Sequence, residues 1–323
     1  MGDTALTVGT FNLNNLFDRW NFEGAVDVLA SGTGSVPATY TFDDEHRRRL
    51  QLDGNGKLLT AKKPEDTNRV AERLLGADVD VWIVQEVENV DVLREFNRDH
   101  LNGTYQHVMV IDGNDSTRFI DIGLLSRRPI GGVTSYQRTF HPDVPDRPIF
   151  SRDLVEAEIL DARGRKILTV FGTHLKSKFV DFKVADQAAA EAASHLLRTR
   201  QAETIVRIMA SRMSTRQRYL LCGDMNDTPD SSALVAYEKA GLVSALTAPT
   251  EIGTVQTTVQ LPASPAWTST FKDTGQPRSF DLIDQIWMSP ALAPRLTGSF
   301  IGRRRKLARD GTDHDPAWIS LDL

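Results

Sequence analysis

Apolar runs of strand length recur along this sequence, and two different kinds of segment connect them. Residues 67–75 and the alanine-rich residues 184–210 have helix-forming composition, with Gly76 just past the end of the first predicted helix. Residues 161–164 are instead a hairpin-turn signal between two strand-like runs within residues 154–173. Crossover helices join parallel strands, whereas hairpins join antiparallel ones. The sequence therefore predicts an α/β fold built as a two-sheet sandwich rather than a doubly wound parallel sheet.

The strand signals extend over almost the whole chain, from the segment ALTVGTFNL near its start to residues 317–321. One stretch breaks the pattern, because residues 19–63 are polar and glycine-rich and show little periodicity. With 40% hydrophobic and 25% charged residues, the chain can bury a sizeable core. We expect one domain over residues 1–323, with an insertion at about residues 19–63.

Several classes of protein are disfavoured by composition. No run approaches the roughly 18 apolar residues of a spanning helix, so no membrane span is expected. No signal peptide is visible, which predicts a cytoplasmic protein, with secretion or a periplasmic location left open if a leader has been removed. The single Cys222 excludes an intramolecular disulfide bond. The net charge of -5 argues against a large basic face for nucleic acid, although an enzyme needs only transient contact, and the basic residues 303–306 are expected in a solvated loop.

Polar side chains stand where the predicted strands meet loops. Strand ends are where a rigid sheet presents side chains to a shared cleft, so these residues predict one common site. They are Asn12, Asn14, Gln85, Glu86, His174, Asp224, Asn226, Asp284, Asp313 and His314.

The segment LLCGDMND is the strongest single signal, because an apolar strand ends in Asp224 and Asn226. A carboxylate and an amide at this spacing suit a hard cation or a phosphate ester, and a turn stabilised by Asp or Asn side chains is the alternative. An EF-hand fits less well, since Thr228 and Pro229 interrupt its pattern. In VWIVQEVEN, Glu86 follows a buried strand and is expected to bind a metal or a cationic partner; its alternative is an exposed acid at the first loop position.

Two histidines stand beside charged residues. His174 ends a predicted strand and is followed by Lys176 and Lys178, which suits an anionic substrate, although a lone histidine there is often structural. His314 follows Asp313, and Asp284 could hold the imidazole in one tautomer, which would make a general base.

The inventory of ligands points to a hard metal ion. One cysteine, scattered histidines and no HExxH or CxxC pair argue against zinc, whereas carboxylate and amide oxygens favour Mg²⁺ or Mn²⁺, with Ca²⁺ left open. Serine-hydrolase and P-loop readings lose their support, because neither GxSxG nor GxxxxGK[ST] occurs.

Taken in order, seven segments resemble the successive motifs of the endonuclease/exonuclease/phosphatase superfamily, which includes deoxyribonuclease I, exonuclease III, sphingomyelinases and inositol polyphosphate phosphatases. The segments are TFNLNNLFD, VQEVE, IGLLSR, GTHLKSK, GDMND, LIDQIWMS and TDHDPAW. The resemblance implies a four-layer α/β sandwich of the deoxyribonuclease I kind, with two mixed sheets face to face, helices outside and an active site at one edge that binds one or two divalent ions.

The resemblance also implies roles for single residues. Glu86 looks like the principal metal ligand, with Asn12 and Asp313 as its helpers. Asp224 and Asn226 are similar to the pair that positions the attacking water and the phosphate. His174 resembles the imidazole that contacts the phosphate or the leaving group, and the roles implied for His314 and Asp284 are those of a general base pair. Asp224 stays open as the alternative base.

The sequence departs from the family pattern at Asn14 and at the RIDY segment, and His174 indicates a branch of the family. Asn14 stands where many apurinic endonucleases have Asp, so a second metal ligand there is in doubt, and the RIDY segment reads LIDQ here. His174, where apurinic endonucleases typically have Tyr, makes the chain more similar to the deoxyribonuclease I and sphingomyelinase branches.

The function expected from the sequence is metal-dependent hydrolysis of a phosphodiester by a monomeric nuclease, with DNA favoured over RNA. Arg118 and Lys176 are expected to contact substrate phosphate. A phosphomonoesterase, a phospholipid phosphodiesterase and a catalytically silent binding module remain alternatives. For the aromatic residues Trp20, Phe22 and Trp267, core packing is favoured over stacking on bases.

Overall fold

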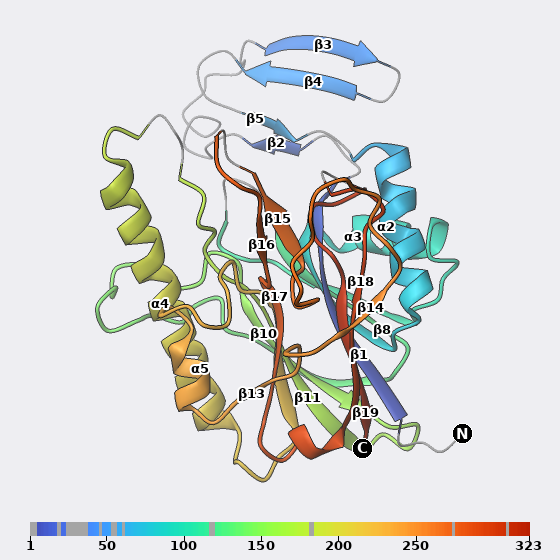
Figure 1. Cartoon of the computed structure of the whole chain (residues 1–323), viewed down its shortest axis with the longest axis vertical. Helices are drawn as coiled ribbons and strands as arrows, with labels where there is room; N and C mark the ends of the chain where they lie inside the picture. Colours follow the sequence, from blue (N-terminus) through green and yellow to red (C-terminus); the bar gives the residue numbers. More distant parts are fainter. Residues whose placement is uncertain are drawn as a thin grey trace, which may run out of the picture.

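Two large mixed sheets dominate the computed structural model, which describes residues 5–17, 21–23, 38–44, 47–52, 57–59, 62–115, 120–180, 184–272, 275–307 and 310–323 (Figure 1). The seven-stranded sheet has the order β14 (Thr250–Ile252), β18 (Leu296–Gly302), β19 (Ala317–Asp322), β1 (Ala5–Leu16), β6 (Val81–Val87), β8 (Asp121–Ser126) and β7 (His107–Ile111). The six-stranded sheet has the order β13 (Val243–Ser244), β17 (Asp284–Met288), β12 (Tyr219–Asp224), β11 (Lys166–His174), β10 (Leu154–Leu160) and β9 (Ile130–Ser135). Strands β1 and β6 are parallel, as are β11 and β12, whereas β12 and β17 are antiparallel.

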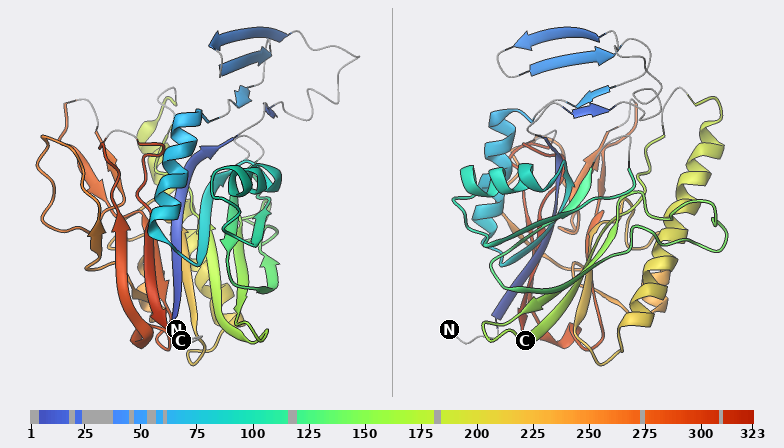
Figure 2. Two further views of the ribbon diagram at one scale, coloured as in Figure 1. Left: turned by 90° about the vertical axis from the view of Figure 1, so that its right-hand side faces the viewer. Right: turned by 180° about the vertical axis from the view of Figure 1, so that it is seen from behind.

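Three hydrophobic clusters separate four layers. Residues of both sheets, such as Val8 and Val170, form the first cluster between the sheets. The second packs helices α2 (Pro64–Ala77) and α3 (Val90–Asp99) against the outer face of the seven-stranded sheet. The third packs α4 (Gln187–Arg212) and α5 (Val235–Lys239) against the six-stranded sheet. Figures 1 and 2 show the two helix pairs on opposite flanks, which confirms the predicted four-layer sandwich.

Helix α2 departs from its sequence prediction at both ends. It starts at Pro64, whose fixed φ suits the first turn, and Glu65 and Asp66 place negative charge at its positive end. Gly76 lies inside the helix rather than past its end. Asp78, at φ 51, caps the helix in the left-handed conformation that glycine was expected to supply.

Within the predicted insertion the structure describes four short strands. Strand β2 (Asn21–Glu23) pairs with β5 (Lys57–Leu59), and β3 (Ala38–Asp44) pairs with β4 (Arg47–Leu52). Neither pair joins a large sheet, and Figures 1 and 2 show both beyond the end of the sandwich toward which β1 runs.

A further hairpin, β15 (Ser269–Phe271) with β16 (Ser279–Asp281), precedes β17, and a 3-10 turn, η1 (Ala293–Arg295), precedes β18. Among the helices that the structure describes, none has the length and apolar character needed to cross a bilayer.

The structure tests the exposure expected of the basic residues 303–306 and the burial expected of Trp267. The solvated loop expected at residues 303–306 is wrong for its first half, since Arg303 and Arg304 are 7% and 0% exposed and are bound by buried partners. Core packing is confirmed for Trp267, which is 1% exposed. The side chains of Trp20 and Phe22 lie outside what the structure describes.

Candidate active site

Four of the expected site residues extend the inward-facing side of their strands past the hydrophobic core. Side chains two residues apart share one face of a strand. Asn12 in β1 therefore lies on the same face as Leu6 and Val8, and His174, Asp224 and Asp284 lie on the core-facing sides of β11, β12 and β17. The strand register sets His174 beside Asp224 and Asp224 beside Asp284. The site is thus the polar end of the space between the two sheets.

Asp224 is the hub of this group. Its Oδ2 accepts a hydrogen bond of 3.0 Å from Asn12 Nδ2 and lies 3.5 Å from His174 Nε2, while its Oδ1 accepts the Asn226 N–H at 2.9 Å. The bond to Oδ1 is that of the turn weighed as the alternative interpretation of GDMND, while Oδ2 contacts two other candidate site residues, Asn12 and His174. Burial is the main reason that the pKa of Asp224 is raised to about 7, although the charge of His314 opposes the shift.

His314 and Asp284 form the expected pair. Nδ1 of His314 lies 2.8 Å from Oδ2 of Asp284, which is fully buried, and Nε2 of His314 lies 3.9 Å from Asp224 Oδ2. Burial lowers the pKa of His314, but the charge and hydrogen bond of Asp284 outweigh it, and the net result is a pKa of about 10. Thr268 fixes the other partner, because its hydroxyl accepts the Asp284 N–H at 3.0 Å.

Glu86 lies within β6 rather than at an exposed loop position. It is 8% exposed and stands where the β6 register shifts, with φ 62. Its Oε2 accepts the Asn15 N–H at 3.1 Å, and Asn14 and Asn15 also have positive φ, 51 and 59. Left-handed backbone costs free energy in residues other than glycine and concentrates at functional sites. The ends of β1 and β6 are therefore held in a specialised conformation around Glu86.

Asn14 connects this region to Asp313. Its Nδ2 donates a hydrogen bond to Asp313 Oδ1, and its N–H donates to Asn12 Oδ1 at 2.8 Å. Burial raises the pKa of Asp313, but the charge of His314 and the Asn14 bond outweigh it and leave the pKa below its usual value. Thr312 adds a link that the sequence did not indicate, since its hydroxyl donates to Asn12 O at 2.9 Å and accepts the His314 N–H at 3.1 Å.

Asn226 has a buried arginine as its neighbour. Asn226 Nδ2 and Arg152 Nη2 both donate to the carbonyl of Leu175, at 3.0 and 2.7 Å. Arg152 is 5% exposed. Sequence reasoning missed it, although an arginine two residues before a buried strand was a usable signal, because buried charges need partners.

The two residues expected to contact substrate phosphate are Lys176 and Arg118. Lys176 is half-buried, and its Nζ donates to Ser177 O at 3.1 Å. Arg118 lies outside the described residues. Lys62, which was not expected at the site, donates from Nζ to Asn14 O at 2.8 Å and brings a cation to the end of β1.

Two arrangements of these side chains offer oxygen ligands to a cation. Glu86, Asn12 and Asp313 are linked through Asn14 and Asn15, as above. Among the described residues, one possible ligand atom each from Asp224, Asp284 and His314 also lie within 4.8 Å of one another. Asp284 Oδ1 is buried and has no hydrogen-bond partner there.

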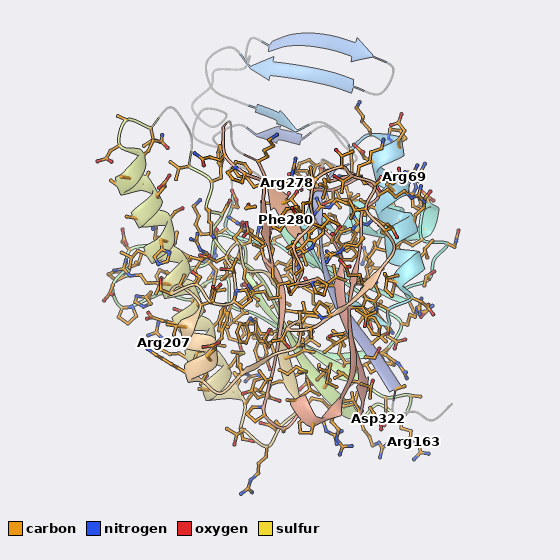
Figure 3. The ribbon with its side chains drawn as sticks, in the orientation of Figure 1. Arg69, Arg163, Arg207, Arg278, Phe280 and Asp322 are labelled. Atoms are coloured by element: carbon orange, nitrogen blue, oxygen red, sulfur yellow. The ribbon has the colours of Figure 1, made fainter. Side chains whose placement is uncertain are left out.

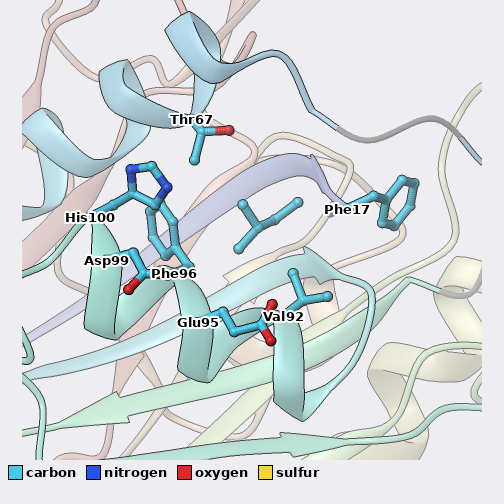
Figure 4. Close-up of a pocket in the computed structure, with 8 residues that line it drawn as sticks. Phe17, Thr67, Val92, Glu95, Phe96, Asp99 and His100 are labelled. Atoms are coloured by element: carbon cyan, nitrogen blue, oxygen red, sulfur yellow. The ribbon is translucent and has the colours of Figure 1, made fainter. Parts of the chain in front are cut away.

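A separate small hollow opens on the helical side of β1 (Figure 4). It has a volume of about 50 Å³ and is lined by Phe17, Thr67, Glu95 and Phe96, among others. None of the residues that line it is one of the candidate site residues, so this hollow is not the candidate active site.

Comparison with known proteins agrees with this architecture. The model of the Endonuclease/Exonuclease/phosphatase family matches residues 9–314. An endonuclease/exonuclease/phosphatase structure from Bacteroides vulgatus is 16% identical, with a TM-score of 0.60 and coverage of 99% of each chain. An AP endonuclease from Archaeoglobus fulgidus is 18% identical, with a TM-score of 0.56 and coverage of 98% of this chain and 100% of that one.

A mannosyl-6-phosphatase from Bacteroides thetaiotaomicron is 14% identical, with a TM-score of 0.53 and coverage of 97% of this chain and 98% of that one. At these identities the likeness shows a shared fold. A search among curated proteins found no match.

Proposed function

The chain belongs to the endonuclease/exonuclease/phosphatase family, and on that premise we propose that it is a metal-dependent nuclease that hydrolyses phosphodiester bonds, in DNA rather than RNA, as a monomer. The observation that carries the proposal is the 2.8 Å pair of His314 and Asp284 beside the buried Asp224. Such a cluster can move a proton between water and a phosphate ester.

We propose Glu86, Asn12 and Asp313 as the metal ligands. Their donor atoms are carboxylate and amide oxygens, which suit Mg²⁺ or Mn²⁺ and also Ca²⁺. The group of Asp224, Asp284 and His314 is the poorer cation site, because His314 Nδ1 is already bound to Asp284. A divalent cation at Glu86 would neutralise charge on the phosphate and, by repulsion, favour the neutral form of His314.

The proposed proton transfer uses His314 Nε2. Asp284 holds Nδ1, so Nε2 is the nitrogen left to face water and Asp224. With its pKa raised to about 10, His314 keeps a proton at neutral pH until its surroundings change, whereas Asp224, with a pKa of about 7, can accept one. Asp224 is therefore the alternative base, with His314 as the acid, and the two groups titrate together.

The proposed phosphate contacts are His174, Asn226, Lys176 and Arg118. His174 reaches the same Asp224 oxygen as Asn12 does and can share a proton with a phosphate oxygen. Arg152 adds positive charge behind Asn226, which would favour the charged transition state.

A phosphomonoesterase is the second candidate, because a mannosyl-6-phosphatase shares the fold. The deciding experiment compares plasmid DNA, single-stranded DNA, RNA, bis-p-nitrophenyl phosphate and p-nitrophenyl phosphate with Mg²⁺, Mn²⁺ or EDTA. Wild type is compared with Glu86→Ala and His314→Ala, and Glu72→Gln on the exposed face of α2 is the control. Metal-dependent polymer cleavage that both site variants lose supports a nuclease. Turnover of the monoester alone indicates a phosphatase, phospholipid substrates then being the next assay, and no hydrolysis at all indicates a binding module.

A further inference from the structure

Asp315, the residue after His314, is fully buried and binds three arginines. Its Oδ1 lies 2.6 Å from Arg73 Nη2 and 3.1 Å from Arg304 Nε, and its Oδ2 lies 3.1 Å from Arg303 Nη1. The backbone N–H of Arg304 also donates to Oδ1, at 3.0 Å. The arginine side chains are 11%, 0% and 1% exposed in the order Arg73, Arg304, Arg303, so water screens these charges little.

The same arginines reach backbone carbonyls around the active site. Arg73 Nη1 donates to His314 O at 2.9 Å, and Arg304 Nη1 donates to Asp313 O. Arg304 Nη2 donates to Thr268 O at 2.7 Å, and the Thr268 hydroxyl accepts the Asp284 N–H. The Asp315 carboxylate thus orients the arginines that bind the backbone of Asp313 and His314. Through Arg304 it also reaches Thr268, which binds Asp284.

Stability alone is a weak reason for this arrangement. Three buried guanidinium groups face one buried carboxylate, and Glu251, which pairs with Arg303, is 44% exposed. Burying charges is costly, and apolar side chains of similar volume often stabilise a core as well or better. What apolar side chains cannot supply is directional bonding to carbonyl groups, which planar guanidinium groups provide.

Two of these arginines lie over aromatic rings. The guanidinium carbon of Arg73 lies 5.0 Å from the centre of the Phe11 ring, and that of Arg303 lies 3.6 Å from Trp267. The cluster therefore joins helix α2, the end of β18 and the segment before β15 into one frame behind His314.

We propose that Asp315 is a positioning residue for the hydrolytic reaction: it acts through Arg73 and Arg304 to hold the backbone of Asp313 and His314 in the geometry that His314 needs to meet Asp284. Asp315 does not touch substrate in this scheme. The inference rests on the proposed function, because it assigns His314 to the chemistry.

The test is Asp315→Asn, which keeps the shape of the side chain but turns one acceptor oxygen into a donor facing an arginine. We expect kcat to fall by about 10- to 100-fold, while KM changes by less than about threefold. In the same variant, amide hydrogen exchange at Asp313 and His314 should accelerate by about tenfold or more relative to amides in the middle of β6 and β12.

The matched control is Asp161→Asn. Asp161 is also a buried carboxylate, 3% exposed in its side chain, and it binds Arg165 in the turn between β10 and β11. Figure 3 shows Arg163 of this turn near the bottom of the sandwich, whereas Arg278 and Phe280, of the hairpin that precedes Asp284, lie in its upper part. This variant should lower the melting temperature without changing kcat at temperatures where the protein is folded.

The outcomes are separable. Uniform acceleration of exchange, or a loss of kcat no larger than that of Asp161→Asn, would mean that Asp315 only stabilises the fold, and the inference would be overturned. If Asp315→Asn does not fold, Arg73→Gln replaces it with the same two readouts, and Arg73→Lys tests whether a cation restores them. If wild type hydrolyses none of the phosphate esters, the proposed function fails, yet the exchange pattern still decides whether Asp315 fixes His314.

Discussion

Asn12 and Asp224 join the two sheets at the candidate active site: the amide on β1 donates to the carboxylate on β12 over 3.0 Å, and both residues are 1% exposed. Because the hydrogen bond stabilises the charged carboxylate, it lowers the pKa of Asp224, while burial raises it. This bond therefore links the two sheets and is one of several interactions, after burial and the charges of His314 and Asp284, that set the pKa of Asp224.

Replacing Asn12 with Ala should move the pH dependence of hydrolysis. Loss of the bond raises the pKa of Asp224 further above 7, so the rising limb of the rate against pH should shift to higher pH. At pH 7 the rate should fall by about tenfold or more, since a buried acceptor loses its donor. The measurement is kcat/KM from pH 5 to 9. Thr10→Val, on the same face of β1, keeps the Asn12 bond and should leave the limb in place; an equal shift in both variants would contradict the assignment.

His314→Ala and Asp284→Asn should each lower kcat by about 10² to 10⁴-fold, because both remove the same proton-transfer unit. The double variant should be no slower than the slower single variant, since residues that act as one unit are not additive. Single-turnover rates of all three variants against wild type measure this. Multiplicative losses would show that the two side chains act separately.

Glu86→Gln should weaken metal binding without unfolding the chain. We expect the melting temperature of wild type to rise with added Mn²⁺, because a ligand that binds only the folded state stabilises it. The variant should need about 10- to 100-fold more Mn²⁺ for the same rise. Differential scanning fluorimetry with an EDTA baseline measures the effect, with Glu72→Gln as control. An unchanged Mn²⁺ response would remove Glu86 from the ligand set.

Asp121 should make the fold less stable as pH rises. Burial raises the pKa of this carboxyl to about 7, whereas its value in the unfolded chain is near 3.8. The folded state thus binds the proton more tightly, so the free energy of unfolding should fall between about pH 4 and pH 7, by at most roughly 4 kcal/mol.

Asp121→Asn should remove this slope, because an amide does not titrate. Its oxygen can still accept the Gly113 N–H that bonds Asp121 Oδ1 at 2.6 Å, so the local structure is kept. Urea unfolding across pH 4 to 8 measures the slope, and the exposed Asp230→Asn is the control. A slope that survives in Asp121→Asn would assign it to other groups.

The strand ends were predictable because period-two alternation places Asn12, Asp224 and Asp284 on the face that also carries the core. The strands β9 and β18 were not, since glycines and half-exposed side chains blur the apolar signal in IGGVTS and LTGSFIG. The backbone at Glu86 was not predictable either, because no sequence pattern around this residue indicates its register shift or its positive φ.

The supporting residues were missed for a different reason. Arg73 and Asp315 are 242 positions apart, and Arg152 and Asn226 meet at the carbonyl of Leu175. Such contacts depend on how the layers pack, and one sequence read strand by strand does not contain that distance information.

The two sheets meet through their side chains, so the separation of catalytic groups depends on the thickness of the hydrophobic layer beneath them. Gly172 shows how little room there is, because a Cβ at that position would lie 2.8 Å from Ile83 of the opposite sheet. A larger side chain in the hydrophobic layer between the sheets should therefore increase the distance between Asn12 and Asp224. The rate of the proposed hydrolysis should thus be sensitive to changes in side-chain volume in this layer, far from any atom that would touch substrate.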